Sequence, residues 1–293
     1  MNDRIKKLRE ESLAAKPYIS HERAVLITEF YKSGTPDRVS VPVARALTFK
    51  HLLQHKKIWI GKGELIVGER GPEPKGTPTY PELCTHSQSD LNILNSRKKI
   101  PFKVSPQTRK IYQAEIMPFW KGRSIRDRIF EEVDDAWKDA YQAGIFTEFM
   151  EQRAPGHTVL DDKIYRMGML DFKQHIANQI EQLDNYHDPE ALDKKEQLRA
   201  MDIAADTLIL FAKRYADEAR KQARKEKDSQ RKTELMTIAD ICECVPAHPP
   251  RTFREALQYY WFVHLGVITE LNTWDSFNPG RLDQHLYPFY VKE

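Results

Sequence analysis

The stretch Thr252-Phe-Arg-Glu-Ala-Leu-Gln-Tyr-Tyr-Trp-Phe-Val-His-Leu-Gly-Val-Ile-Thr-Glu270 decides the fold of this chain. Thr252 followed by Glu255 forms a capping-box pattern, which predicts that a helix begins here. Apolar side chains then occupy nearly every face of this helix, and a helix of that kind is buried inside a large protein. The chain has 293 residues, 40% of them hydrophobic, which is enough to bury such a helix in a core.

The rest of the chain also shows mainly helical signals. Ser20 can cap a helix that ends near Gly34, and Ser105-Pro106 marks the start of a helix that ends near Met117. Apolar residues at helical spacing predict further helices over residues 42–55, 161–184 and 198–219. Two short apolar runs around a glycine-containing turn favour a β-hairpin over residues 57–67. Residues 71–81 are rich in Pro and Gly, which predicts an irregular loop.

The composition excludes several classes of protein. Charged residues make up 30% of the chain and the net charge is only +3, so we expect no nucleic-acid partner. Residues 1–16 are charged throughout and residues 259–269 are too few to span a bilayer, so we expect a cytoplasmic protein without a membrane segment. The cysteines Cys84, Cys242 and Cys244 lack the spacing of zinc ligands, so we expect reduced thiols and no metal site.

Two polar segments are candidates for a functional site. The first is Phe146-Thr-Glu-Phe149-Met-Glu-Gln-Arg153-Ala-Pro155-Gly-His157. Pro155 cannot continue a helix, so this segment is predicted to end a helix in a turn. That turn would present polar side chains beside aromatic rings, as in a small-molecule pocket.

The second polar segment begins where the apolar helix ends, in Glu270-Leu-Asn-Thr-Trp274-Asp275-Ser-Phe-Asn-Pro-Gly280. Carboxylates at the edge of a core are costly without partners, so Glu270 and Asp275 are expected to be hydrogen-bonded or functional. The spacing alone favours a structural interpretation, in which Asp275 caps a turn and an Arg281–Asp283 ion pair supports the fold.

Several motifs together resemble those of the pyruvate formate-lyase-like glycyl radical enzymes. They are Glu22-Arg23-Ala24, Glu64-Leu-Ile-Val-Gly68, Arg254-Glu-Ala-Leu-Gln258, Trp261-Phe262 and Gly280-Arg-Leu-Asp-Gln-His-Leu-Tyr-Pro-Phe-Tyr290. The resemblance covers essentially the whole chain. It implies the α/β fold of that family, with this chain as the N-terminal, mainly helical part of a ten-stranded glycyl radical enzyme barrel. Residues 1–293 would then form one incomplete pyruvate formate-lyase-type domain.

Within the family, residues 146–157 and the pair Trp274-Asp275 are most similar to dehydratases of the trans-4-hydroxy-L-proline type. The resemblance implies that His157 and Asp275 are catalytic and lie at the hydroxyl group that leaves as water. It implies that Phe149 packs on the substrate ring, so that Phe149, His157 and Asp275 bind the small-molecule substrate. An imidazole and a carboxylate can share a proton and assist a departing oxygen, which suits this role.

The same resemblance implies a glycyl radical that a partner radical-SAM activating enzyme installs, no bound cofactor, and a homodimer in the complete protein. This chain departs from the family because it contains neither the cysteine loop followed by a glutamate nor the Arg-Val-x-Gly motif that carries the radical. Cys84, Cys242 and Cys244 stand in other contexts, and the chain stops at Glu293. We therefore expect the N-terminal portion of a lyase, inactive on its own.

Other readings stay open. Within the family they are pyruvate formate-lyase (formate acetyltransferase), a C–S lyase of a hydroxyalkyl sulfonate, and an arylacetate decarboxylase. Outside it, the chain could be a non-catalytic helical scaffold whose periodic helix over residues 198–219 contacts a partner. A pocket requires His157 and Asp275 to lie within about 10 Å of each other, which a scaffold does not require.

Overall fold

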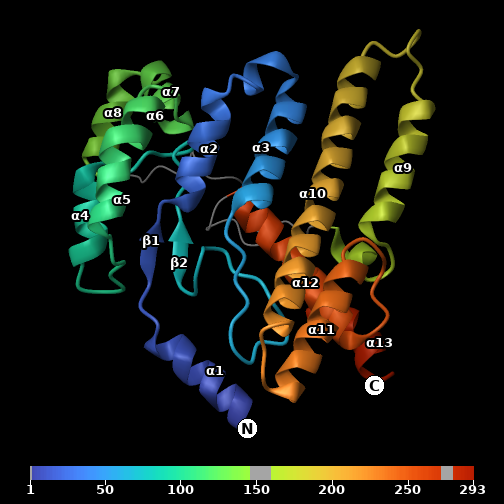
Figure 1. Ribbon diagram of the computed structural model, residues 1–293. Coiled ribbons are helices and arrows are strands. Elements are labelled where there is room, and N and C mark those ends of the chain that lie inside the picture. The colour runs from blue at the N-terminus through green and yellow to red at the C-terminus, as the bar shows by residue number, and fades with distance from the viewer. Residues whose placement is uncertain (1, 146–159, 272–279) are drawn as a thin grey trace.

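The computed structural model describes residues 2–145, 160–271 and 280–293 (Figure 1). The elements of the first part are α1 (Asp3–Ala14), β1 (Tyr18–Ser20), α2 (Glu22–Lys32), η1 (Pro36–Arg38), α3 (Val41–His55), β2 (Gly76–Pro78), α4 (Gln88–Ser96), α5 (Pro106–Ile111), η2 (Tyr112–Ile116), α6 (Met117–Trp120), α7 (Ile125–Glu132) and α8 (Asp135–Gln142). Those of the second part are η3 (Asp161–Tyr165), α9 (Met169–Glu181), α10 (Ala191–Ala223), α11 (Ser229–Cys244), α12 (Phe253–Glu270) and α13 (Leu282–Tyr290). The expectation of a mainly helical chain with few strands is confirmed. None of the described helices has both the length and the apolar character that crossing a membrane requires.

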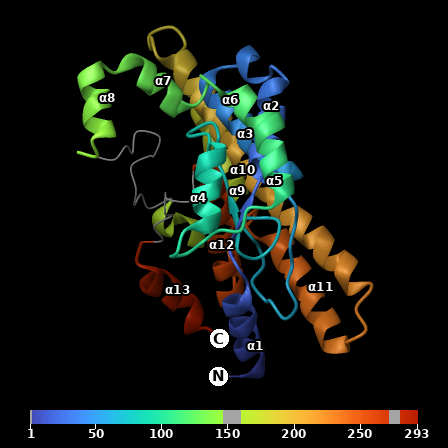
Figure 2. The same ribbon diagram turned by 90° about the vertical axis from the view of Figure 1, so that its left-hand side faces the viewer.

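The long helix α10 organises the larger core. It packs against α3, α9 and α11, as both views show (Figures 1 and 2). Its buried face carries small residues, among them Ala212, Ala216 and Ala219, which let neighbouring helices approach closely. Tyr215 on the same face is fully buried and packs edge-on against Phe211. The periodic residues from Ala205 to Ala219 therefore serve packing, whereas Met201 is exposed. The helix extends past the predicted range at both ends.

A second core lies between α2 and the helices α4 to α6 (Figure 1). Trp120 is buried there, and its indole N–H donates a hydrogen bond to Thr28 Oγ1 at 2.8 Å. The helix that Ser105 caps was expected to end at Met117, but it runs on as a π-helical turn and α6 to Trp120. The prediction was too short because the wider π-turn before Pro118 accommodates a residue without an N–H.

The predicted helix over residues 161–184 is interrupted. It consists of η3 and α9, which begin at Asp161 and Met169. Gly168 separates them, and a Cβ at this glycine would lie 2.2 Å from the carbonyl oxygen of Ala247. The Met169 N–H donates to Pro246 O at 2.7 Å instead of to its own helix. This contact with a loop remote in sequence breaks the helix, and local periodicity does not report it.

The predicted hairpin over residues 57–67 is wrong, because no strand forms there. The strands among the described residues are β1 and β2, and β2 lies within the stretch that was expected to be an irregular loop. They pair in parallel, with Tyr18 opposite Gly76 and Ser20 opposite Pro78. Ser20 ends β1, so α2 begins at Glu22, slightly later than the predicted cap placed it.

Side chains of α12 and α11 take the place of a strand partner for residues 61–68. The amide of Gln258 accepts from the Val67 N–H and donates to the Val67 carbonyl, each at 2.8 Å. Trp261 Nε1 donates to the carbonyl of Gly68 at 2.9 Å. Gly68 adopts φ +135°, and a Cβ there would lie 2.4 Å from Leu265 Cδ1, so only glycine fits.

Two arginines complete this arrangement. Arg254 Nη2 donates to Leu65 O at 3.0 Å, and Arg231 donates to Glu64 O at 2.8 Å and to Gly61 O at 3.0 Å. Backbone polar groups that leave water need partners, and here the partners come from helices far along the chain. The segment is therefore a strap held on α12, with no need for a sheet.

We predict that Gln258→Leu lowers the free energy of unfolding by roughly 2–4 kcal/mol, because it leaves the N–H and the C=O of Val67 buried and unpaired. The matched control is Gln230→Leu at an exposed position of α11, which should change stability by no more than about 0.5 kcal/mol. Urea unfolding of both variants measures the difference. A Gln258→Leu protein as stable as the control would show that these two hydrogen bonds do not support the strap.

Candidate functional site

The three predicted site residues lie outside the described part of the chain. Phe149 and His157 belong to residues 146–159, and Asp275 belongs to residues 272–279. Their roles remain predictions. The structure describes the residues on either side of these two segments, which are Leu160 after the first and Leu271 and Gly280 around the second.

A groove of about 460 Å³ joins the ends of the two segments. Leu160 and Leu271 both line it, together with residues of α3, α10 and α12. The groove is mostly apolar, and its volume is in the range of small-molecule sites. The described residue that follows the first segment and the one that precedes the second therefore line the same groove.

The backbone at the first of these ends is strained. Leu160 has φ +61° and Asp161 has φ +45°, two successive left-handed residues that are not glycine. Each such residue costs on the order of 1–3 kcal/mol and persists only where its surroundings impose it. Asp161 Oδ1 lies 3.5 Å from His285 Nε2 of α13. The helix that follows residues 272–279 in the chain therefore contacts the start of η3, which follows residues 146–159.

The rim of the groove carries an ion pair between α3 and α12. Arg45 binds Glu270, the last residue of α12, through two nitrogens, with Arg45 Nη2 at 3.0 Å from Glu270 Oε2. The hydrogen bonds that Arg45 donates to Glu270 raise the pKa of Arg45. The expectation that Glu270 is hydrogen-bonded is thus confirmed, and its partner fixes the end of α12 against α3.

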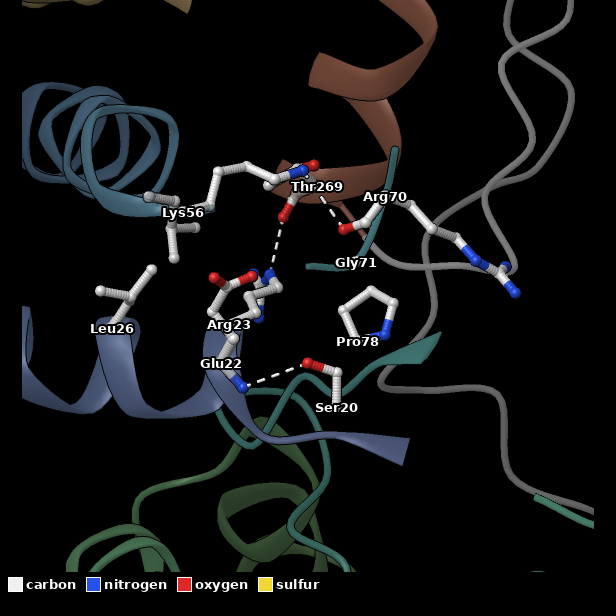
Figure 3. Close-up of a pocket in the computed structure, with 10 residues that line it drawn as sticks. Ser20, Glu22, Arg23, Leu26, Lys56, Arg70, Gly71, Pro78 and Thr269 are labelled. Atoms are coloured by element: carbon white, nitrogen blue, oxygen red, sulfur yellow. Dashed lines mark hydrogen bonds between the residues drawn. The ribbon is translucent and has the colours of Figure 1, made fainter. Parts of the chain in front are cut away.

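The last carbonyls of α12 are bound by side chains from the start of the chain. Tyr80 Oη donates to Ile268 O, and Arg23 Nε donates to Thr269 O at 2.7 Å (Figure 3). Both carbonyls lie in the last turn of α12, and the C=O groups of a last turn find no N–H donor within their own helix. The guanidinium also places a positive charge at the negative end of the helix dipole.

Arg23 is itself fully enclosed in a set of acceptors. It is 5% exposed, pairs with Glu82 through both terminal nitrogens and donates to Thr79 O at 3.2 Å. Its guanidinium carbon lies 3.8 Å from the centre of the Tyr80 ring. Burial alone would lower the pKa of Arg23, but the carboxylate of Glu82 raises it, so the cation is retained.

Lys56 lies beside Arg23 in the same buried region (Figure 3). It is 4% exposed, and its ammonium donates to Glu69 O at 2.9 Å and to Arg70 O at 3.2 Å. Burial lowers the pKa of Lys56 to about 8. Glu22 stands nearby, and burial raises the pKa of its carboxyl group. A void of about 10 Å³ between these residues is too small for any ligand larger than water.

This cluster is therefore a support for α12, and a substrate does not fit into it. Sequence reasoning quoted Arg23 only as part of a motif and did not find Tyr80, Glu82, Lys56 or Arg45. The available signal was the run Glu22-Arg23-Ala24, which places an arginine at the start of an otherwise apolar helix face. An arginine in such a position needs a buried acceptor, and that requirement could have identified it.

The cysteines do not form a metal site. Cys84, Cys242 and Cys244 form no disulfide, and among the described residues no group of three or more His, Cys, Asp or Glu is arranged to hold a metal ion. Burial raises the pKa of the Cys242 thiol well above its usual range, so this thiol is protonated and unreactive.

The comparisons with known proteins agree with one another. A family model described as pyruvate formate lyase-like matches residues 1–293. The chain is 53% identical to trans-4-hydroxy-L-proline dehydratase from Clostridioides difficile, over 99% of this chain and 37% of that protein. It is 32% identical to isethionate sulfite-lyase from Nitratidesulfovibrio vulgaris, over 95% of this chain and 34% of that protein.

Solved structures give the same picture. The C. difficile hydroxyproline dehydratase with its substrate bound superposes with a TM-score of 0.94, at 53% identity, over 100% of this chain and 37% of that chain. A structure from Roseburia inulinivorans concerned with 1,2-propanediol dehydration superposes with a TM-score of 0.91, at 32% identity, over 100% of this chain and 35% of that chain. The chain thus spans little more than a third of the length of these relatives.

We predict that Arg23→Met lowers the free energy of unfolding by about 3–5 kcal/mol, because it leaves the Glu82 carboxylate without its buried partner and Thr269 O without a donor. The comparison variant is Arg45→Met, which breaks a half-exposed pair and should cost no more than about 1 kcal/mol. The double variant Arg23→Met, Glu82→Leu should recover part of the loss, since it removes the unpaired charge. Equal losses for Arg23→Met and Arg45→Met in denaturant unfolding would contradict this account.

Buried Lys56 should make the stability of the chain depend on pH. Unfolded Lys56 titrates near 10.5 and folded Lys56 near 8, so above pH 8 the unfolded chain holds more protons and stability rises with pH. Between pH 8 and 9 the wild type should gain roughly 1 kcal/mol relative to Lys56→Met, at about 1.4 kcal/mol per pH unit for one full proton. The adjacent, exposed Lys57 is the control, since Lys57→Met should keep the slope of the wild type. Parallel curves for the wild type and Lys56→Met would refute the assignment.

Proposed function

Because this chain belongs to the pyruvate formate lyase-like family, we propose that it supplies part of the substrate pocket of a glycyl radical dehydratase. The proposed substrate is a hydroxylated small molecule of the trans-4-hydroxy-L-proline type. The observation that carries the proposal is the 53% identity to a trans-4-hydroxy-L-proline dehydratase over 99% of this chain. The groove that Leu160 and Leu271 both line supports it.

The proposed roles of the residues follow from their chemistry. His157 and Asp275 would hydrogen-bond the hydroxyl group that leaves and provide the proton with which it departs as water. Phe149 would place an aromatic face on the pyrrolidine ring and keep water away from the reacting carbon. Arg45, Arg23 and Tyr80 would act on none of these atoms, because their donors are occupied by α12, Thr79 and Glu82.

The radical chemistry would come from outside this sequence. A glycyl radical installed by a radical-SAM activating enzyme would supply the hydrogen-atom abstraction in the complete enzyme. The 293 residues contain no Arg-Val-x-Gly motif to carry it. The proposal therefore assigns this chain substrate binding and proton transfer, with no turnover by the chain alone.

A second candidate is cleavage of a carbon–sulfur bond, because the chain is also 32% identical to an isethionate sulfite-lyase. A sulfonate needs cations in the pocket. The described cations at the groove and behind it, Arg45 and Arg23, are already paired with Glu270 and Glu82. Because trans-4-hydroxy-L-proline also carries an anionic group, its carboxylate, these paired arginines do not separate the two candidates.

The test joins residues 1–293 to the remaining part of the C. difficile relative, in place of the matching 37% of that protein. The hybrid is activated under anaerobic conditions and offered trans-4-hydroxy-L-proline, isethionate or pyruvate. We expect loss of water from trans-4-hydroxy-L-proline, detected by mass spectrometry. We expect His157→Gln or Asp275→Asn to slow it by about 10²–10⁴-fold.

Matched controls are His175→Gln and Asp283→Asn, which change the same residue types at exposed positions of α9 and α13. Both should retain the rate of the unmodified hybrid. Turnover of isethionate or pyruvate in place of trans-4-hydroxy-L-proline would replace the proposed reaction by one of the alternatives. Full activity of His157→Gln would remove the assigned acid.

A further inference from the structure

The last turn of α3 carries two histidines that no part of the proposed function uses. His51 and His55 stand four residues apart in His51-Leu-Leu-Gln-His55, so both project from one face of the helix. Their ring centres are 4.4 Å apart. We propose that these two rings form a binding site for a transition-metal dication such as Zn²⁺, Ni²⁺ or Cu²⁺, with Nε2 of each ring as a ligand.

The hydrogen bond of His55 leaves a lone pair on its Nε2, and Nε2 of His51 is not engaged by any described residue. His55 Nδ1 lies 2.8 Å from the carbonyl oxygen of His51, and a carbonyl only accepts, so His55 carries its proton on Nδ1. Its Nε2 is then the unprotonated nitrogen, as in a metal-bound histidine whose other nitrogen donates to a carbonyl. His51 Nε2 has no hydrogen-bond partner among the described residues and is shielded from solvent. An orphaned ring nitrogen next to a second imidazole is what a chelate site requires.

The electrostatic surroundings also suit a cation. The carboxylate of Glu29 on α2 interacts electrostatically with the His51 ring, so a negative charge stands near the site. Phe30 packs on the His51 ring with centres 5.4 Å apart and limits its rotation. His55 is exposed, so an ion can approach its ring from the solvent.

The ligand set determines which metals bind and how firmly. No third His, Cys, Asp or Glu completes the site among the described residues, so water would fill the remaining positions. Imidazole pairs select the later first-row metals, with Cu²⁺ bound more tightly than Ni²⁺ or Zn²⁺. Mg²⁺ and Ca²⁺ prefer oxygen ligands and should not bind. The spacing matches that of zinc peptidases, but Leu52 stands where those enzymes carry their glutamate base, so the site has no hydrolytic role.

Metal binding should stabilise the folded chain. The chelate would close the last turn of α3, the turn that leads directly into Lys56. The unfolded chain does not hold the two rings together, so binding favours the native state by mass action. The inference is independent of the proposed dehydratase activity, because neither ring lines the groove.

The experiment uses the chain of residues 1–293 without a histidine tag, freed of metal with a chelator and then dialysed. Its thermal unfolding midpoint and binding heat are measured with ZnSO₄, NiCl₂, CuCl₂ and MgCl₂. We expect the midpoint to rise by roughly 4 °C or more with the first three salts, at metal concentrations about a hundredfold above the dissociation constant. MgCl₂ should not change it.

The variant His55→Gln should abolish the shift, and it alters only an exposed side chain, so folding is not in question. His51→Gln should do the same, while His187→Gln, at an exposed histidine paired with Asp184, should keep the full shift. A shift that survives in His55→Gln would place the metal elsewhere and overturn the assignment. The absence of any shift or binding heat in the wild type would overturn it as well.

Discussion

The hydrogen bond from Arg23 to Thr269 O is the contact on which the arrangement of this chain depends. A buried helix that ends inside a protein leaves its last carbonyls without partners, at the negative end of its dipole. Arg23 and Tyr80 bind two of those carbonyls from elements 246 and 188 positions earlier in the chain. The buried charge on Arg23 is stabilised by the carboxylate of Glu82, which accepts from both of its terminal nitrogens. The end of α12 is thus fixed by the first part of the chain.

The same helix also dictates the path of residues 61–68. Gln258 and Trp261 bind backbone groups of this strap that a β-sheet would otherwise bind. The apolar faces of α12 pack on α3, α10 and α11, and its polar side chains are reserved for backbone partners. This explains why the sequence of the helix is apolar on nearly every face and yet contains the polar residues Arg254 and Gln258. Arg254 and Gln258 are thus structural residues, because the segment that they bind has no regular secondary structure of its own.

The sequence predicted those elements whose pattern lies within their own residues. Helices α3, α10 and α12 followed from periodicity and caps, because each has an apolar face that repeats along its own length. The false hairpin over residues 57–67 had the same local pattern as a true one. Its outcome was decided by Gln258, a residue 191 positions away from Val67. The same limit applies at the groove. The position of Glu270 at the edge of the core predicted that it is hydrogen-bonded, but only the structure identified Arg45 as its partner.

In this fold, the backbone arrangement can stay the same while the substrate changes. Solved relatives that share less than a third of their residues with this chain keep the same backbone, although the substrates in their descriptions, 1,2-propanediol and glycerol, differ. Arg23, Tyr80 and Arg45 spend their donors on α12 and Glu82, so they cannot distinguish one substrate from another. Selectivity between substrates must then come from side chains other than these three. A change at Arg23 therefore lowers stability before it affects any reaction.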